Sequence, residues 1–428
     1  MSTRRSFLKL SSLSVGAATL GLSKPLPARA DNSDLPGPIV ALESLADQAR
    51  PVTAEERGAR IEKARALMLE QGLEGILLTG GTSLNYFTGV SWSLSERLFA
   101  LLLPARGRAF VVCPAFEAER AREQLAKGPL AESSDVLTWE EHEDPYKKVA
   151  TGLSSLNIQS GVLGIEETVQ YQFSEGMAKS VPGLDYQRAT SVTAGCRMTK
   201  DAHELELMQL ASTVTLKAYE ATYRSLEAGM SQAKIRELIS AAHDRLGFSG
   251  GAMVLIGSGS ALPHGSIKPE TLREGTIVLI DGGCGVEGYR SDISRTFVLG
   301  KPTQKMTDVF AIEVEAQDAA LAAAGPGIPC EAVDAAARKV IVDAGFGPDY
   351  KYFSHRVGHG IGMDGHEWPY LVRGNRLPME PGMTFSDEPG IYLPGEFGVR
   401  LEDDMIITDS GAKLFTLQSR SLERPFGD

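Results

Sequence analysis

Short hydrophobic runs alternate with stretches of helical periodicity through the first half of the chain. The first helical stretch, residues 57–71, ends at Gly72, a residue typical of helix C-termini. A charged helical stretch covers residues 114–127. Strand-like runs, separated by turns that contain glycine or proline, lie at residues 75–79, 98–103, 109–113 and 161–166. Because strands that alternate with helices pack as layers, residues 51–195 are predicted to form an α/β domain.

The pattern changes near Arg197, where longer helical stretches begin. Asp201 and Glu204 have the spacing of a capping box and begin a helix that is expected to reach residue 227. Ser231 begins a second helix that ends at Gly247. Strand-like segments follow at residues 276–281 and 289–299.

The same order of elements then recurs. A helical stretch at residues 304–324 is followed by a break at Gly325 and by another helix that ends at Gly345. Two helices followed by a hairpin, twice over, predict an α+β domain over residues 196–428. This domain is expected to have pseudo-two-fold symmetry, with its cleft between the two halves.

The first thirty residues have the features of an export signal rather than of a folded element. Arg4 and Arg5 form a pair that is followed by two apolar residues, as in twin-arginine signals, and residues 10–22 are mildly apolar. An A-x-A site ends at Ala30. A disordered basic tail would not explain this order of features. The pattern therefore predicts a signal over residues 1–30, cleavage after Ala30 and a periplasmic location.

Residues 31–50 are interpreted as a linker. They are polar, and Pro36 and Pro38 are expected to break any regular element. Beyond the signal, no stretch is long and apolar enough to predict a membrane helix.

The charge of the chain argues against nucleic acid or an anionic membrane as a partner. The 428 residues carry a net charge of −12. Residues 1–30 hold five basic residues and no acid, so the remainder, with 38 basic and 55 acidic residues, has a net charge of −17. A surface this acidic repels polyanions. Four cysteines without C-x-x-C spacing are expected to be free buried thiols: Cys113, Cys196, Cys284 and Cys330.

Two aspartates are predicted to face each other across a hairpin. Asp281 ends an apolar strand, Gly282 and Gly283 permit a sharp turn, and Asp292 lies in the next strand. Paired strands lie about 5 Å apart, so both carboxylates can occupy one side of the sheet. Asp281 alone would be an ordinary Asp-Gly turn residue. Asp292 and the residues described next favour a cation shared by both, because two unpaired carboxylates this close would not both ionise.

Three histidines lie within twelve glycine-rich positions. His359 is flanked by Gly358 and Gly360, and His355 and His366 lie four positions before it and seven after it. A single histidine is more often a core residue than a ligand, but three among interleaved glycines favour a ligand or substrate site. The glycines also argue against the H-E-x-x-H helix of zinc proteases.

Two glutamates complete an acidic set. Glu388 precedes an apolar strand, and Glu402 follows Arg400 by two positions, hence on the same face of a strand. Arg400 is expected either to bind a substrate carboxylate or to orient a metal ligand. Four carboxylates and one imidazole cannot be buried together unless cations neutralise them, so the set predicts a two-metal hydrolytic centre. The candidate ligands are Asp281, Asp292, His359, Glu388 and Glu402.

Four strings of the sequence resemble the metal-binding signature of the pita-bread metallopeptidases. This family includes aminopeptidase P, prolidase, methionine aminopeptidase and the metal-free creatinase. The strings are DGGCGVEGYRSDISRTF, GHGIGMDGHE, DEPGIY and VRLEDD, and the resemblance extends from Arg197 to about residue 420. Residues 84–89, LNYFTG, resemble the creatinase-type N-terminal domain. The resemblance implies a creatinase-like α/β domain before a pita-bread catalytic domain, and the Xaa-Pro branch of the family.

The resemblance also implies a role for each candidate ligand. Asp292 and Glu402 would bridge two divalent ions, Asp281 would bind one ion, and His359 with Glu388 would bind the other. The two ions would share a water and lower its pKa. Glu388 would take the proton as the resulting hydroxide attacks the peptide carbonyl.

Further histidines would assist the reaction. By resemblance, His366 and His264 would stabilise the oxyanion and hold the substrate, and His355 would support them. An oxygen-dominated ligand set favours Mn²⁺, with Co²⁺ or Zn²⁺ as alternatives.

These features predict an exported, Mn²⁺-dependent peptidase of the aminopeptidase P type, which cleaves the N-terminal Xaa-Pro bond of proline-containing peptides. Three alternatives stay open. The first is a prolidase restricted to Xaa-Pro dipeptides, and the second is a pita-bread enzyme with a non-peptide substrate such as dimethylsulfoniopropionate, which a lyase would cleave. The third is a non-catalytic binding protein. The complete ligand set favours hydrolysis, and the resemblance implies a homodimer.

Overall fold

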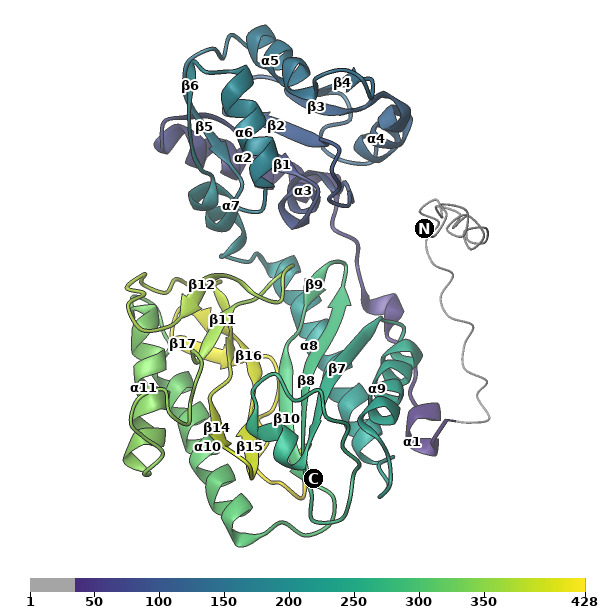
Figure 1. The fold of residues 1–428 in the computed structure, drawn as a ribbon, viewed down its shortest axis with the longest axis vertical. Helices are drawn as coiled ribbons and strands as arrows, with labels where there is room; N and C mark the ends of the chain where they lie inside the picture. The colour runs from purple at the N-terminus through teal and green to yellow at the C-terminus, as the bar shows by residue number, and fades with distance from the viewer. Residues whose placement is uncertain (1–34, 428) are drawn as a thin grey trace, which may run out of the picture.

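The computed structural model describes residues 35–427, which form an N-terminal and a C-terminal domain (Figure 1). The N-terminal domain contains a mixed six-stranded sheet with the order β4-β3-β2-β1-β5-β6. Strand β2 pairs antiparallel with both β1 and β3. The remaining pairs are parallel: β4 with β3, β5 with β1, and β6 with β5. The strands are β1 (Leu73–Thr79), β2 (Ala100–Pro104), β3 (Ala109–Pro114), β4 (Ser134–Trp139), β5 (Gly161–Ile165) and β6 (Leu184–Arg188).

Helices cover both faces of this sheet. Alternate residues of a strand point to opposite faces. Accordingly, Ile76 and Leu78 of β1 pack in one apolar cluster with α2, α3, α4 and α7, whereas Leu77 packs in another with α5 and α6. The helices are α2 (Ala54–Glu70), α3 (Thr82–Thr88), α4 (Ala118–Leu125), α5 (Pro145–Ser155), α6 (Tyr171–Ser180) and α7 (Thr190–Arg197). The predicted α/β domain is confirmed.

The first half of the C-terminal domain packs two helices against an antiparallel sheet. The predicted capping box is present, because Asp201 accepts a hydrogen bond from the Glu204 amide and Glu204 accepts one from the Asp201 amide. The sheet has the order β10-β8-β7, and β9 pairs with β8. The elements are α8 (Ala202–Tyr223), α9 (Gln232–Leu246), β7 (Gly250–Ile256), β8 (Ile277–Val286), β9 (Tyr289–Arg290) and β10 (Ile293–Val298).

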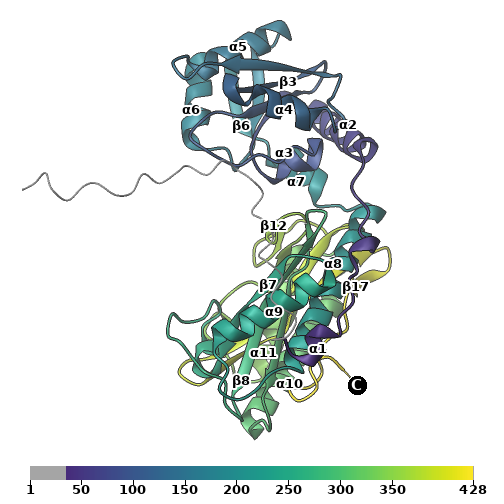
Figure 2. The ribbon, with the colours of Figure 1, turned by 90° about the vertical axis from the view of Figure 1, so that its right-hand side faces the viewer.

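The second half repeats this plan with a larger sheet. Its five strands have the order β12-β11-β13-β16-β17, and β14 and β15 form a separate hairpin. The elements are α10 (Gln304–Ala323), α11 (Cys330–Asp343), β11 (Gly358–Gly360), β12 (Glu367–Leu371), β13 (Thr384–Asp387), β14 (Gly390–Leu393), β15 (Phe397–Arg400), β16 (Asp403–Thr408) and β17 (Gly411–Leu414). The sheets lie between α8 and α9 on one side and α10 and α11 on the other (Figures 1 and 2). This is the predicted pita-bread architecture.

The prediction that residues 31–50 contain no regular element is wrong, because helix α1 (Gly37–Val40) lies within them. Proline lacks an amide hydrogen, but the first turn of a helix needs none, so Pro36 can precede α1 and Pro38 can lie within it. Ile39 is fully buried between α8 and α9, and this burial holds α1 on the C-terminal domain.

The predicted hairpin also differs in detail. Strand β8 continues past Asp281 to Val286. The strand expected at residues 289–299 is interrupted at Ser291 and Asp292, which separate β9 from β10. Sequence patterns missed β7, which begins with Gly250 and Gly251, because two glycines weaken the strand signal.

Three further predictions concern the chain as a whole. The export signal and its cleavage site lie outside the described residues. None of the helices within residues 35–427 has the length and apolar character that crossing a membrane requires. The four cysteines are buried and free, as expected.

Candidate metal centre

The five candidate ligands come from both halves of the C-terminal domain. The first half contributes Asp281 from β8 and Asp292 from the break before β10. The second half contributes His359 from β11, Glu388 from the end of β13, and Glu402 from between β15 and β16. The site therefore lies between the halves, where the internal repeat predicts a cleft.

Strand pairing brings the two aspartates together. In the β8–β10 register, Asp281 lies opposite Ser294, two positions after Asp292. Gly283, within β8, lets the segment before β10 approach closely: a Cβ there would lie 1.9 Å from the carbonyl oxygen of Ser291, so a side chain would push the segment away. The expectation that both carboxylates lie on one side of the hairpin is confirmed by their shared cluster of ligand atoms.

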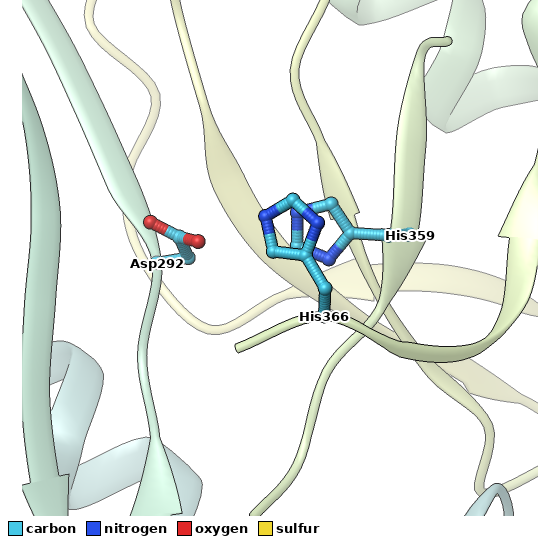
Figure 3. Close-up of side chains that lie close together, drawn as sticks. All are labelled: Asp292, His359 and His366. Carbon is cyan, nitrogen blue, oxygen red and sulfur yellow. The ribbon is translucent and has the colours of Figure 1, made fainter. Parts of the chain in front are cut away.

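Three overlapping groups of side chains could each hold a cation. Within each group, the ligand atoms lie within 4.8 Å of one another. The groups are Asp281, Asp292 and Glu402; His359, Glu388 and Glu402; and Asp292, His359 and His366. Asp292, His359 and Glu402 each belong to two groups, and the bridging roles of Asp292 and Glu402 stay a prediction. Figure 3 shows the third group, in which His366 and His359 lie together opposite Asp292.

Hydrogen bonds fasten the ligands of one half to the other half. The hydroxyl of Ser294 donates to Glu402 Oε2 at 2.7 Å, and the two residues also form an isolated β-bridge. The amide of Asp292 donates to Asp404 Oδ2 at 2.9 Å. These bonds align Asp292, just before β10, and Glu402, just before β16, across the junction.

The electrostatics of the site fit divalent cations. Burial, together with repulsion by Asp281, raises the pKa of Asp292 to about 8. Burial, together with Asp292 and Glu388, also raises the pKa of Glu402 well above its usual range. Carboxylates this close resist ionisation until positive charge compensates them. Oxygen-rich sets of this kind suit Mn²⁺ and Mg²⁺, and the imidazole admits transition metals.

His359 and Glu388 lie at ion-pair distance from each other. Nε2 of His359 lies 3.2 Å from Oε1 of Glu388. Burial by itself would raise the pKa of Glu388, but His359, together with the charges of His355 and Arg400, lowers the pKa to about 2. Desolvation would likewise lower the pKa of His359, yet Glu388 raises it to about 9. A metal ligand must be a neutral imidazole, so cation binding would release this proton.

The other predicted histidines occupy different positions. His366 is exposed, and its ring stacks on that of His359 with centroids 3.8 Å apart. Desolvation and the neighbouring His359 lower the pKa of His366. His355 is half-buried and lies 2.7 Å from the Tyr392 hydroxyl. His264 lies on an exposed loop outside all three cation groups, and its substrate role stays a prediction.

Arg400 orients a ligand, which was one of its two expected roles. Its Nη2 donates to Asp281 Oδ2 at 2.6 Å, and its Nε donates to Ser294 at 3.1 Å. Its Nη1 donates to the Tyr392 hydroxyl at 2.8 Å and to the carbonyl of Pro263 at 3.2 Å. Because every nitrogen of the guanidinium is engaged, Arg400 is a poor candidate for binding a substrate carboxylate.

Several supporting residues were missed by sequence reasoning. They are Ser294, Ser386, Tyr392 and Asp404, which hold the ligands or Arg400 in place. The Ser386 hydroxyl, for example, accepts a hydrogen bond from the His359 amide at 3.0 Å. Each lies within or beside a signature string, but only the paired strands show what it contacts.

The chain belongs to metallopeptidase family M24, whose model matches residues 206–409. A model of the creatinase/prolidase N-terminal domain matches residues 60–199. The chain is 37% identical over 366 residues to a probable dipeptidase PepE of Mycobacterium bovis, covering 85% of this chain and 95% of that protein. It is 33% identical over 372 residues to an Xaa-Pro dipeptidase of Lactobacillus delbrueckii, covering 85% and 98%. The crystal structure of dipeptidase PepE from Mycobacterium ulcerans superposes with a TM-score of 0.81 at 33% identity, covering 87% and 99%.

The metal-free protein is expected to lose stability as the pH rises from 6.5 to 8.5. The raised pKa of Asp292 favours its neutral form in the folded state, so stability falls as the pH rises toward about 8. The raised pKa of His359 means that the folded state holds this proton more tightly than the unfolded state. Its contribution to the free energy of unfolding is fully present below the ordinary pKa of histidine and is lost as the pH rises through about 9. Each group contributes a slope of about 1.4 kcal/mol per pH unit at most.

Urea unfolding in the presence of a chelator, at several pH values, measures this slope. Asp292→Asn should flatten it, whereas Glu396→Gln, at a surface ion pair with Lys305, should leave it unchanged. Adding Mn²⁺ should raise the free energy of unfolding most at high pH, where the ligands are ionised. A free energy that rises over this range would contradict the assignment.

Proposed function

We propose that this chain is an Xaa-Pro dipeptidase, which hydrolyses the bond between an N-terminal residue and a C-terminal proline. The five candidate ligands, brought together between the two halves of a family M24 domain, are the observation that carries the proposal. The relatives described above bear dipeptidase names. The prolidase alternative therefore has better support than the aminopeptidase P-like activity that the sequence first favoured. The signature strings serve both activities, so they could not separate them.

Two divalent cations fit the site, with Asp292 and Glu402 shared between them. Asp281 would complete one coordination set, and His359 with Glu388 would complete the other. When bound, such cations acidify water and polarise a carbonyl group. The preponderance of oxygen ligands favours Mn²⁺.

The protein's own groups then handle the protons and the developing charge. The Glu388 carboxylate belongs to a cation group and its side chain is 14% exposed, so it can accept a proton from the attacking water. His366 lies at the exposed edge of the cluster, where its ring can donate a hydrogen bond to the carbonyl oxygen as negative charge develops there.

A dipeptidase must also recognise the free carboxylate of its substrate, and we assign this role to Arg356. Within the described residues, Arg356 has no ion pair with a carboxylate. Its guanidinium lies 4.1 Å from the ring centroid of Tyr370, and Tyr370 pairs with His359 across β11 and β12. The charge of Arg356 also contributes to lowering the pKa of His366, which places it within electrostatic reach of the site. Arg400, by contrast, is buried and already donates four hydrogen bonds to protein groups.

The purified protein should hydrolyse Xaa-Pro dipeptides faster than Xaa-Pro-Xaa tripeptides. EDTA should abolish the activity, and Mn²⁺ should restore it. Glu388→Gln should lower kcat at least about 100-fold, because it removes the proton acceptor and a ligand, whereas Glu396→Gln should not. Rates from product release measure each effect. Metal-dependent cleavage of neither substrate would refute the proposal, and faster tripeptide cleavage would favour the aminopeptidase activity.

Replacing Arg356 tests the recognition of the carboxylate. Arg356→Gln should raise KM for an Xaa-Pro dipeptide about tenfold or more, because a charge-assisted hydrogen bond is lost. It should change KM little for the corresponding Xaa-Pro amide, which lacks the carboxylate. Arg373→Gln is a matched control, because Arg373 also lies over a tyrosine ring but pairs with Asp349 at the surface. Equal effects on both substrates would contradict the role of Arg356.

We further infer, from sequence alone, that residues 1–30 direct export through the twin-arginine route. The full-length protein should appear in the periplasmic fraction of a bacterial host. Replacing both Arg4 and Arg5 with lysine should retain it in the cytoplasm, whereas Lys24→Gln should not. Immunoblots of cell fractions measure the distribution. Export of the variant that lacks both arginines would contradict the inference.

A further inference from the structure

The exposed histidine of the candidate centre is carried by a loop that the N-terminal domain holds in place. His366 lies in the segment between β11 and β12, which comprises residues 361–366. Within residues 35–427, the ring of His366 makes no hydrogen bond to another protein group. Its orientation over His359 therefore depends on the backbone of this loop and on the stacking of the two rings.

The acidic residues on either side of His366 are both bound by Arg197. Arg197 lies at the end of α7, which packs against α2 in the N-terminal domain and ends two residues beyond the predicted boundary at residue 195. Its Nη2 lies 2.6 Å from Asp364 Oδ2 and also pairs with Glu367. The hydroxyl of Thr82, at the start of α3, donates to Asp364 Oδ1 at 2.5 Å. Two elements of the N-terminal domain thus hold the acidic side chain of Asp364.

The side chain of Glu367, the residue after His366, is more deeply buried than that of Asp364. Lys200 donates to Glu367 Oε1 at 2.7 Å, and these two side chains are 2% and 7% exposed. A Cβ on Gly362 would lie 2.5 Å from the same oxygen, so the loop backbone is packed directly against the ion pair. From the other side, the amide of Arg290 donates to the Gly362 carbonyl at 2.8 Å.

Buried ion pairs are weak evidence for stability, since desolvation offsets most of the attraction, but they can fix one geometry. The chemistry proposed above uses none of Arg197, Asp364 or Glu367. All three meet at the loop that carries His366, whose ring makes no hydrogen bond to another protein group within residues 35–427.

We propose that Arg197 is a positioning residue: through Asp364 and Glu367 it fixes the loop that presents His366 to the reacting carbonyl. The N-terminal domain thereby completes the catalytic site, although none of its residues belongs to the cation groups. This inference rests on the proposed peptidase function, but its structural part can be tested independently of activity.

Arg197→Gln should lower kcat about 10- to 100-fold with little change in KM and in bound metal, because small displacements of a catalytic group have effects of this size. Arg197→Lys should recover part of the loss. In a His366→Ala background, Arg197→Gln should have no more than a threefold further effect, since there is no ring left to position.

Arg60→Gln is the matched control. Arg60 of α2 donates to the Tyr289 hydroxyl at 2.9 Å and pairs with Glu204, so it makes a buried contact between the domains without touching the His366 loop. Any effect of this variant should be the same with and without His366. An Arg197→Gln effect that is equally large in both backgrounds would overturn the proposal, because it would report general damage.

Hydrogen exchange of residues 361–368 gives the readout that needs no activity. Exchange there should increase in Arg197→Gln and stay at the wild-type level in Arg60→Gln. Unchanged exchange in Arg197→Gln would also overturn the proposal. If the wild-type protein hydrolyses no Xaa-Pro peptide, the proposed function fails, and the exchange experiment still decides whether Arg197 fixes the loop.

Discussion

Repulsion among its carboxylates is the main physical constraint on the candidate metal centre of the C-terminal domain. Asp281, Asp292, Glu388 and Glu402 converge between its two halves, and the raised pKa values of Asp292 and Glu402 express the free energy that opposes their common ionisation. Such a set persists only where rigid strands prevent it from separating and where positive charge can enter. The two opposed sheets provide the rigidity, and divalent cations would provide the charge.

The positive groups around this set divide the task. Arg400 is bound to Asp281, and separating the two would leave a buried charge without a partner. His359 is different, because its proton balances Glu388 only until a cation replaces it. The site can therefore bind metal without a large rearrangement: the protons of His359 and of the carboxyls with raised pKa leave, and the network around Arg400 stays.

The two domains make different contributions to this centre. The halves of the C-terminal domain supply all candidate ligands, whereas the N-terminal domain reaches the site through the ion pairs of Arg197. In the role proposed for it, Arg356 would distinguish a substrate that ends at proline from one that continues. Members of one fold family can thus share a metal centre and differ in substrate, because ligands and rim are separate parts of the structure.

The candidate ligands that the structure brings together and the class of fold could be read from the sequence because their signals are local. Asp281 and Asp292 lie close together in the chain, glycines flank His359, and capping residues mark the start of α8. Contacts between distant segments left no such signal. Arg197 and Asp364 are 167 positions apart, and the engagement of Arg400 depends on how β8, β10 and β15 meet. Local chemistry identified which groups can bind metal, whereas the packing of strands and domains determined which groups hold them, because partners far apart in sequence become neighbours only when the chain has folded.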